Sequence, residues 1–195
     1  MNQVTTAETR MPGPLMGRFI GFADRLALWG GYVAITCLVI MAGLMLAQVV
    51  VAFLSKIFPS VRGDISVAWE YGAYLMGTMF LMASAITLRA GRHIRLGVVI
   101  QNCSPRVLRM LEIFCSLIAL LFTVYLTWAL ALGAERAWNM NTTSIESKTP
   151  IWIPLAVFSL GTALLALQFA IRLVSAIFGF ELINTALKAG GEIEE

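Results

Sequence analysis

The chain has 195 residues, of which 59% are hydrophobic and 13% are charged, and its mean hydropathy is +0.83. A soluble domain is about 45–50% apolar and about 25% charged, so a single soluble core is excluded and the excess apolar surface must face lipid. The net charge is +3, and the basic residues lie at the edges of the apolar segments. Membrane topology explains this placement, so the charge does not indicate nucleic-acid binding.

Four segments predict membrane-spanning helices, because each offers about 20 mostly apolar residues to cross roughly 30 Å of hydrocarbon. They lie within a predicted membrane domain of residues 26–173, at about 28–54, 68–88, 112–134 and 150–171. Residues 1–25 are predicted to be a retained N-tail with interfacial helical character, and residues 174–195 a C-tail. The runs are continuously apolar rather than alternating, which favours helices over a β-barrel. The expected fold class is an all-α integral membrane protein with four transmembrane helices.

Prolines and capping residues mark several helix ends. Ser104-Pro105 combines an N-cap residue with proline at the first helical position, so the third helix is expected to begin there. Thr149-Pro150 gives the same signal for the fourth helix, and Phe58-Pro59-Ser60 ends the first. Beyond Arg172, the apolar residues 173–180 either continue the fourth helix or turn along the membrane interface.

The distribution of basic residues predicts the orientation. Ten of the fourteen Lys and Arg residues fall in the N-tail, the connection between the second and third spans, and the C-tail. The other two connections hold four. Because cytoplasmic segments carry the excess of positive charge, both termini are expected in the cytoplasm.

Most chemistry that would make the chain an enzyme or a self-contained pump is missing. It has one histidine and three scattered cysteines, so no metal or haem ligand set is formed, and no phosphate-binding glycine loop or paired nucleophile and base occurs. No catalytic residue, cofactor or metal site is predicted. Charged groups at membrane depth usually mark ion or substrate pathways. No Asp, Glu, Lys, Arg or His lies between the charged residues that bound the four spans, which are Arg25 and Lys56, Glu70 and Arg89, Glu112 and Glu135, and Lys148 and Arg172.

A few polar residues of the spans admit two interpretations each. Glu70, at the entry of the second span, is either paired with another helix or subunit or is an ordinary interfacial acid. Gln48 and Gln168 lie within the first and fourth spans, where we expect them to bridge helices rather than to bind a ligand.

Small residues recur on one side of the second span. Ala73, Gly77, Ser84 and Gly91 could let a neighbouring helix approach closely, or they could reflect chance in a segment rich in small residues.

A basic cluster follows the same span. Its members Arg89, Arg92 and His93 are candidates for contacts with a partner subunit or with anionic phospholipid headgroups.

These features together resemble one family. An acid opens the second span, which closes in Leu88-Arg89-Ala90-Gly91-Arg92-His93-Ile94-Arg95, and the last span opens with Thr149-Pro150-Ile151-Trp152-Ile153-Pro154. The pattern, from about Leu28 to Leu173, is similar to the small membrane subunit (DctQ type) of tripartite ATP-independent periplasmic (TRAP) transporters. Gly97 stands where that family often has an aspartate.

The resemblance implies a non-enzymatic subunit of a bacterial inner-membrane transporter. Its implied partners are a large membrane subunit with the sodium-coupled pathway and a periplasmic protein that captures an organic acid. The small subunit would act as a scaffold and help to dock the binding protein, surrounded by phospholipids. The alternative, from a different class, is a homo-oligomeric channel or small exporter working alone. A third interpretation, a membrane-bound enzyme or redox anchor, would need metal or haem ligands or a nucleophile, and the sequence offers none.

Overall fold

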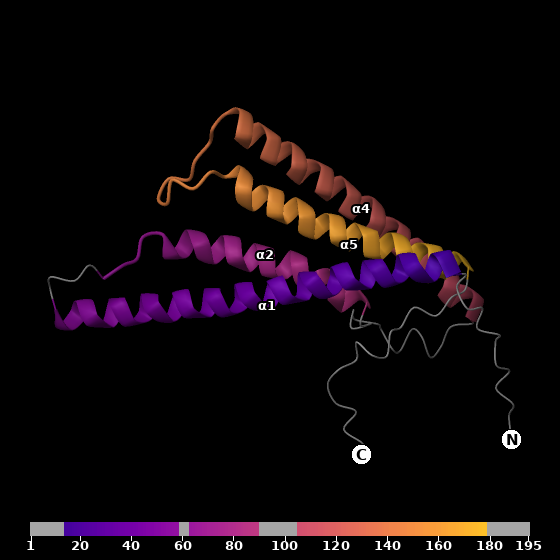
Figure 1. Ribbon diagram of the computed structural model, residues 1–195, viewed down its shortest axis with the longest axis horizontal. Helices are drawn as coiled ribbons and strands as arrows, with labels where there is room; N and C mark the ends of the chain where they lie inside the picture. The colour runs from indigo at the N-terminus through magenta and orange to yellow at the C-terminus, as the bar shows by residue number, and fades with distance from the viewer. Residues whose placement is uncertain (1–13, 59–62, 90–104, 179–195) are drawn as a thin grey trace, which may run out of the picture.

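The computed structural model describes residues 14–58, 63–89 and 105–178. These residues form the helices α1 Pro14–Ile57, α2 Ala68–Arg89, α4 Pro105–Asn139 and α5 Trp152–Phe178 (Figure 1). All four helices are long and apolar enough to cross a membrane, and the described ranges contain no strand. The prediction of an all-α membrane protein with four spanning helices is confirmed.

The helix ends follow most of the sequence signals. Helix α4 begins at Pro105 and α1 ends at Ile57, as the two proline patterns predict. Helix α5 continues without interruption beyond Arg172 to Phe178, which decides between the two alternatives for that segment. Helix α1 begins at Pro14, so the described part of the expected N-tail is helical.

One predicted helix start lies two residues before the observed one. Helix α5 begins at Trp152, because the two residues of the expected cap are engaged elsewhere. Pro150 forms an isolated antiparallel bridge with Thr143, and the Thr149 hydroxyl lies 2.8 Å from the Tyr71 hydroxyl. The connection between α4 and α5 is therefore closed by this bridge, and the Ile153 amide donates to the Pro150 carbonyl at 3.2 Å just before the regular turns of α5.

The same connection has a defined beginning. Asn141 has a positive φ of 49°, a left-handed conformation that asparagine tolerates and that commonly ends a helix. The Thr142 amide donates to the Ala137 carbonyl at 3.1 Å, and the Asn141 amide donates to that of Trp138 at 3.1 Å. This Schellman arrangement satisfies the last carbonyls of α4 and turns the chain sharply towards α5.

The helices pack as two antiparallel pairs. Figure 1 shows α1 beside α2 and α4 beside α5, and the two pairs are joined mainly through α2 and α5. Small residues allow this close approach: a Cβ atom on Gly161 of α5 would lie 2.8 Å from the Leu81 Cβ atom of α2. On α1, Ala23 and Ala27 are almost completely buried at the same junction.

Most of the apolar surface remains outside this small core. Large side chains on α1 and α4 are exposed along nearly their whole length, including Val39 at 65% and Leu121 at 63%. Since four helices cannot bury this surface among themselves, lipid or other membrane proteins must cover it.

Candidate functional site

Polar contacts gather at the two ends of the bundle. The loop end is the end that carries the connections at residues 58–67 and 140–151. The terminal end is the opposite one, where α1 begins, α2 ends, α4 begins and α5 ends.

Glu70 is the centre of a hydrogen-bond network at the loop end. Its carboxylate accepts hydrogen bonds from the Tyr74 hydroxyl at 2.8 Å, from the Ser147 hydroxyl at 2.9 Å and from the Ser147 amide at 3.2 Å. The Ser147 hydroxyl also lies 2.7 Å from the Thr149 hydroxyl, which in turn contacts the Tyr71 hydroxyl. Because hydrogen bonds to an ionised carboxylate are stronger than neutral ones, Glu70 fastens the α4–α5 connection to the start of α2.

A cavity of about 550 Å³ adjoins this network between the start of α2 and the α4–α5 connection. Trp69, Glu70, Ser144 and Ile151 are among the residues that line it. Its rim is open and apolar, since the side chain of Trp69 is 69% exposed and that of Ile145 is 89% exposed. The loop end therefore presents a fixed, partly apolar surface beyond the ends of the helices.

At the terminal end, Arg89 is buried against α1. Its Nε donates to Oδ1 of Asp24 at 2.5 Å and its Nη2 donates to Oδ2 at 2.7 Å. The Arg89 side chain is 6% exposed and that of Asp24 is 17% exposed. A two-point guanidinium–carboxylate contact fixes both the distance and the rotation of α2 relative to α1.

The two intramembrane glutamines both bridge separate parts of the chain. Gln168 of α5 donates through Nε2 to the Ala23 carbonyl of α1 at 2.9 Å, which confirms the predicted bridging of helices. Gln48 instead binds the segment that precedes α2, where it donates to Asp64 and accepts from the Ile65 amide at 2.9 Å. Gln48 thus ties α1 to a connection and not to another helix.

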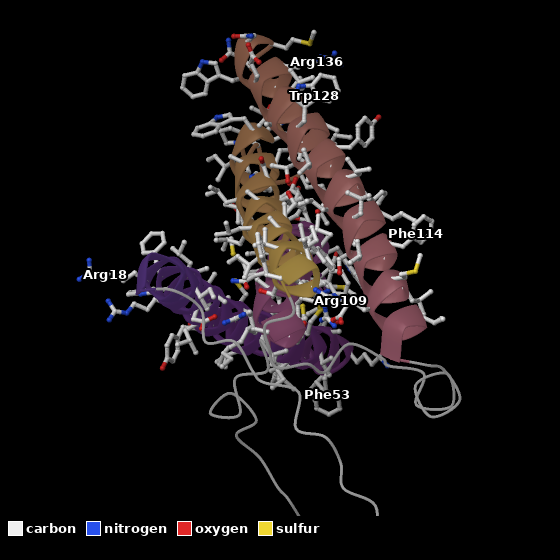
Figure 2. The ribbon with its side chains drawn as sticks, turned by 90° about the vertical axis from the view of Figure 1, so that its right-hand side faces the viewer. Arg18, Phe53, Arg109, Phe114, Trp128 and Arg136 are labelled. Carbon is white, nitrogen blue, oxygen red and sulfur yellow. The ribbon has the colours of Figure 1, made fainter. Side chains whose placement is uncertain are left out.

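Two further arginines join α4 to α5 at the terminal end. Arg109 donates to the carbonyl of Ala176 at 2.9 Å and to that of Ile177 at 2.5 Å, close to the end of α5 (Figure 2). A cation at a helix C-terminus satisfies orphan carbonyls and is favoured by the helix dipole. Arg172 pairs with Glu112 at 3.0 Å. Three arginines of the expected cytoplasmic side are therefore bound within the chain.

The small residues of α2 do not share a neighbour. A Cβ atom on Gly77 would lie 2.6 Å from Cζ of Phe158, so its close approach is to α5 of the same chain. Ala73 is exposed, while Ser84 is half-buried and donates to the Phe80 carbonyl of its own helix at 2.7 Å. Gly91, Arg92 and His93 lie outside the described residues.

Several residues that build these contacts were not singled out from the sequence. Asp24 is separated from Arg89 by 65 positions, and Ser147 from Glu70 by 77. The sequence does offer a signal for Asp24, because it is the sole acidic residue of α1. An unpaired carboxylate there would be costly, so a partner could have been expected. Ser147 carries no comparable signal because serine is common in loops.

No group of three or more His, Cys, Asp or Glu residues that could hold a metal ion occurs in the described part of the chain. The polar clusters of both ends hold helices and connections in place.

Comparison with known protein families identifies the family to which this chain is similar. The model of the family described as "Tripartite ATP-independent periplasmic transporters, DctQ component" matches residues 41–179, well over half of the chain. Neither the curated proteins nor the solved structures give a significant match. The matched region contains the second, third and fourth spanning helices and the Glu70 network, whereas Asp24 lies before it. The match agrees with the resemblance carried by the residues around Arg89. The chain therefore belongs to the DctQ family and is the small membrane subunit of a TRAP transporter of the inner membrane.

Proposed function

We propose that this subunit serves as a scaffold for the large subunit of a sodium-coupled TRAP transporter that imports an organic acid. The observation that carries the proposal is the position of its charges. Between Glu70 and Arg89 of α2, and between Glu112 and Glu135 of α4, no ionisable carboxylate, amine or guanidinium occurs. A coupled pathway needs such groups or other polar ligands at membrane depth.

Two buried threonine hydroxyl groups support the same proposal. Thr123 donates to the Ala119 carbonyl at 2.8 Å, and Thr162 donates to that of Ser159 at 2.9 Å, each within its own helix. These side chains are thus occupied by helix backbone, and the cavity beside Glu70 lies at the loop end of the bundle. Transport through the complex then depends on the large subunit.

We further propose that the loop end faces the periplasm and helps to dock the binding protein. The ten-to-four asymmetry of Lys and Arg favours this orientation, with the N-tail and the C-tail in the cytoplasm. The Glu70 network holds the α4–α5 connection so that Ile145 and Trp69 point outward, and an exposed apolar surface of this kind suits a soluble partner.

Reconstitution of defined subunit combinations tests the proposal. We expect this chain to co-purify with the large subunit, and we expect sodium-dependent uptake of an organic acid only when both membrane subunits and the binding protein are present. Uptake or efflux by this chain alone in proteoliposomes would contradict the scaffold role and support a channel or exporter. Failure to co-purify with the large subunit would contradict it as well.

A further inference from the structure

Helix α1 is much longer than α2, the helix it packs against. At about 1.5 Å per residue, the stretch from Glu70 to Arg89 of α2 is roughly 28 Å long, close to the roughly 30 Å of hydrocarbon. The stretch from Asp24 to Lys56 of α1 is roughly 48 Å long. Both helices belong to one antiparallel pair, so their lengths can be compared directly along that pair.

Two contacts locate the excess at the loop end. The Arg89–Asp24 pair aligns the terminal ends of α2 and α1, and Gln48 binds Asp64 and Ile65 just before α2 begins. The part of α1 from Gln48 to Ile57 is roughly 14 Å long and lies wholly beyond the start of α2. Figure 1 shows α1 reaching past every other helix at this end.

Tilting cannot place all of α1 in hydrocarbon. Spanning helices tilt by at most about 40°, at which the stretch from Asp24 to Lys56 would still cover roughly 37 Å along the membrane normal. The protruding end is nevertheless apolar and open, with Val50 at 55%, Phe53 at 63% and Ile57 at 54% exposure. Figure 2 shows Phe53 standing away from the bundle. Apolar side chains held beyond the hydrocarbon, at the depth of the polar headgroups, are out of reach of the lipid tails, and a protein surface would cover them better.

The exposed surface continues from this end into the membrane. At 100° per residue, the part of α1 between Ile35 and Ile57 carries six large exposed side chains on one narrow strip, which we name the α1 strip: Ile35, Val39, Leu46, Val50, Phe53 and Ile57. A soluble protein could reach the end of this strip but not Ile35 or Val39 at membrane depth. A partner that covers all of it must be embedded in the membrane and extend above its surface.

We infer that the α1 strip is the surface on which the large membrane subunit packs. This inference rests on the proposed scaffold function and assigns it to one helix face. Helix α4 provides the contrast, because its stretch from Glu112 to Glu135 is roughly 34 Å long and fits the hydrocarbon at an ordinary tilt. Its exposed side chains in this stretch, such as Phe114 and Leu121, therefore lie at depths that lipid tails can cover.

Photo-crosslinking in membranes that contain all three subunits tests the assignment. We expect p-benzoylphenylalanine at Val39 and at Phe53 to form adducts with the large subunit, and the same probe at Phe114 to form none above background. Adducts of both strip positions with lipid only, with the binding protein or with a second copy of this chain would overturn the inference. Equal crosslinking of Phe114 to the large subunit would also overturn it.

A matched pair of substitutions gives a second readout. Phe53 and Phe114 are 63% and 61% exposed, so Phe53→Gln and Phe114→Gln remove similar surface from α1 and α4. We expect Phe53→Gln to weaken retention of the large subunit about tenfold, and Phe114→Gln to leave it within about twofold, at equal membrane insertion. If the unmodified chain co-purifies with the large subunit but Phe53→Gln retains it normally, the scaffold function stands and the α1 strip is rejected.

Discussion

Arg89 and Asp24 illustrate how a charge is kept at the edge of an apolar bundle. Both side chains are largely buried, and each provides the partner that the other needs at two points. Removing one member leaves an uncompensated buried charge, which is more harmful than removing both. Each residue of the pair is therefore needed because the other is present, and together they set the register of α1 and α2.

This requirement predicts a graded response to substitution. Asp24→Asn should destabilise the folded subunit by about 3 kcal/mol, because the Arg89 guanidinium would remain buried without its counter-charge. Asp24→Leu combined with Arg89→Met should recover much of that loss. Denaturation by SDS, followed by tryptophan fluorescence, measures both.

The pair between Arg172 and Glu112 is the control. The Glu112 side chain is 44% exposed, so Glu112→Gln should cost less than about 1 kcal/mol. If Asp24→Asn were no worse than Glu112→Gln, the buried pair would have no special role.

Substitution of Glu70 is expected to change the mobility of the α4–α5 connection rather than the stability of the subunit. Glu70→Gln keeps the side-chain shape but removes the charge that attracts the Tyr74 and Ser147 donors. A nitroxide label on Ile145→Cys should become more mobile in this variant, as seen in its electron paramagnetic resonance spectrum. The exposed Glu146→Gln serves as the control, and identical spectra for all three proteins would contradict the role given to Glu70.

At the scale of elements, Gly77 of α2 leaves room for the Phe158 ring of α5 where the two helix pairs meet. Gly77→Leu should force α2 and α5 apart, at a cost of about 1–3 kcal/mol, because even a Cβ atom would lie 2.6 Å from the Phe158 ring. The effect should appear in SDS denaturation of this subunit alone.

Ala73→Leu, at an exposed position one turn away, should be tolerated in the same measurement. The double variant Gly77→Leu with Phe158→Ala should regain part of the stability. A defect of Gly77→Leu that appears only in the presence of the large subunit would instead place this glycine at an interface between subunits.

The sequence predicts these elements better than it predicts their contacts. Continuous apolar runs identify all four spans, because length and hydropathy are local properties. The start of α5 is missed, since proline after threonine does not reveal that Pro150 pairs with Thr143. Gln168 is recognised as a bridge from its type and depth, but its acceptor on Ala23 is 145 positions away and leaves no periodic signal.

For the whole molecule, the orientation is the property that most affects function. A variant without native cysteines but with Ile145→Cys should react with a membrane-impermeant maleimide in intact cells, because Ile145 is 89% exposed at the proposed periplasmic end. A cysteine placed in the C-tail should react only after permeabilisation. Labelling in the reverse pattern would invert the topology and remove the loop end from contact with the binding protein.

The arrangement in two pairs also has a consequence for biosynthesis. Helices α1 and α2 are neighbours in sequence, as are α4 and α5, so each pair can close as a hairpin soon after it leaves the translocon. The contacts that unite the hairpins involve Phe158, Gly161 and Gln168, all of which belong to the last helix to be synthesised. The ribosome must therefore complete α5 before the first hairpin acquires its final neighbour. Until then α1 and α2 lie in the bilayer without α5, and the Asp24–Arg89 pair holds them in register.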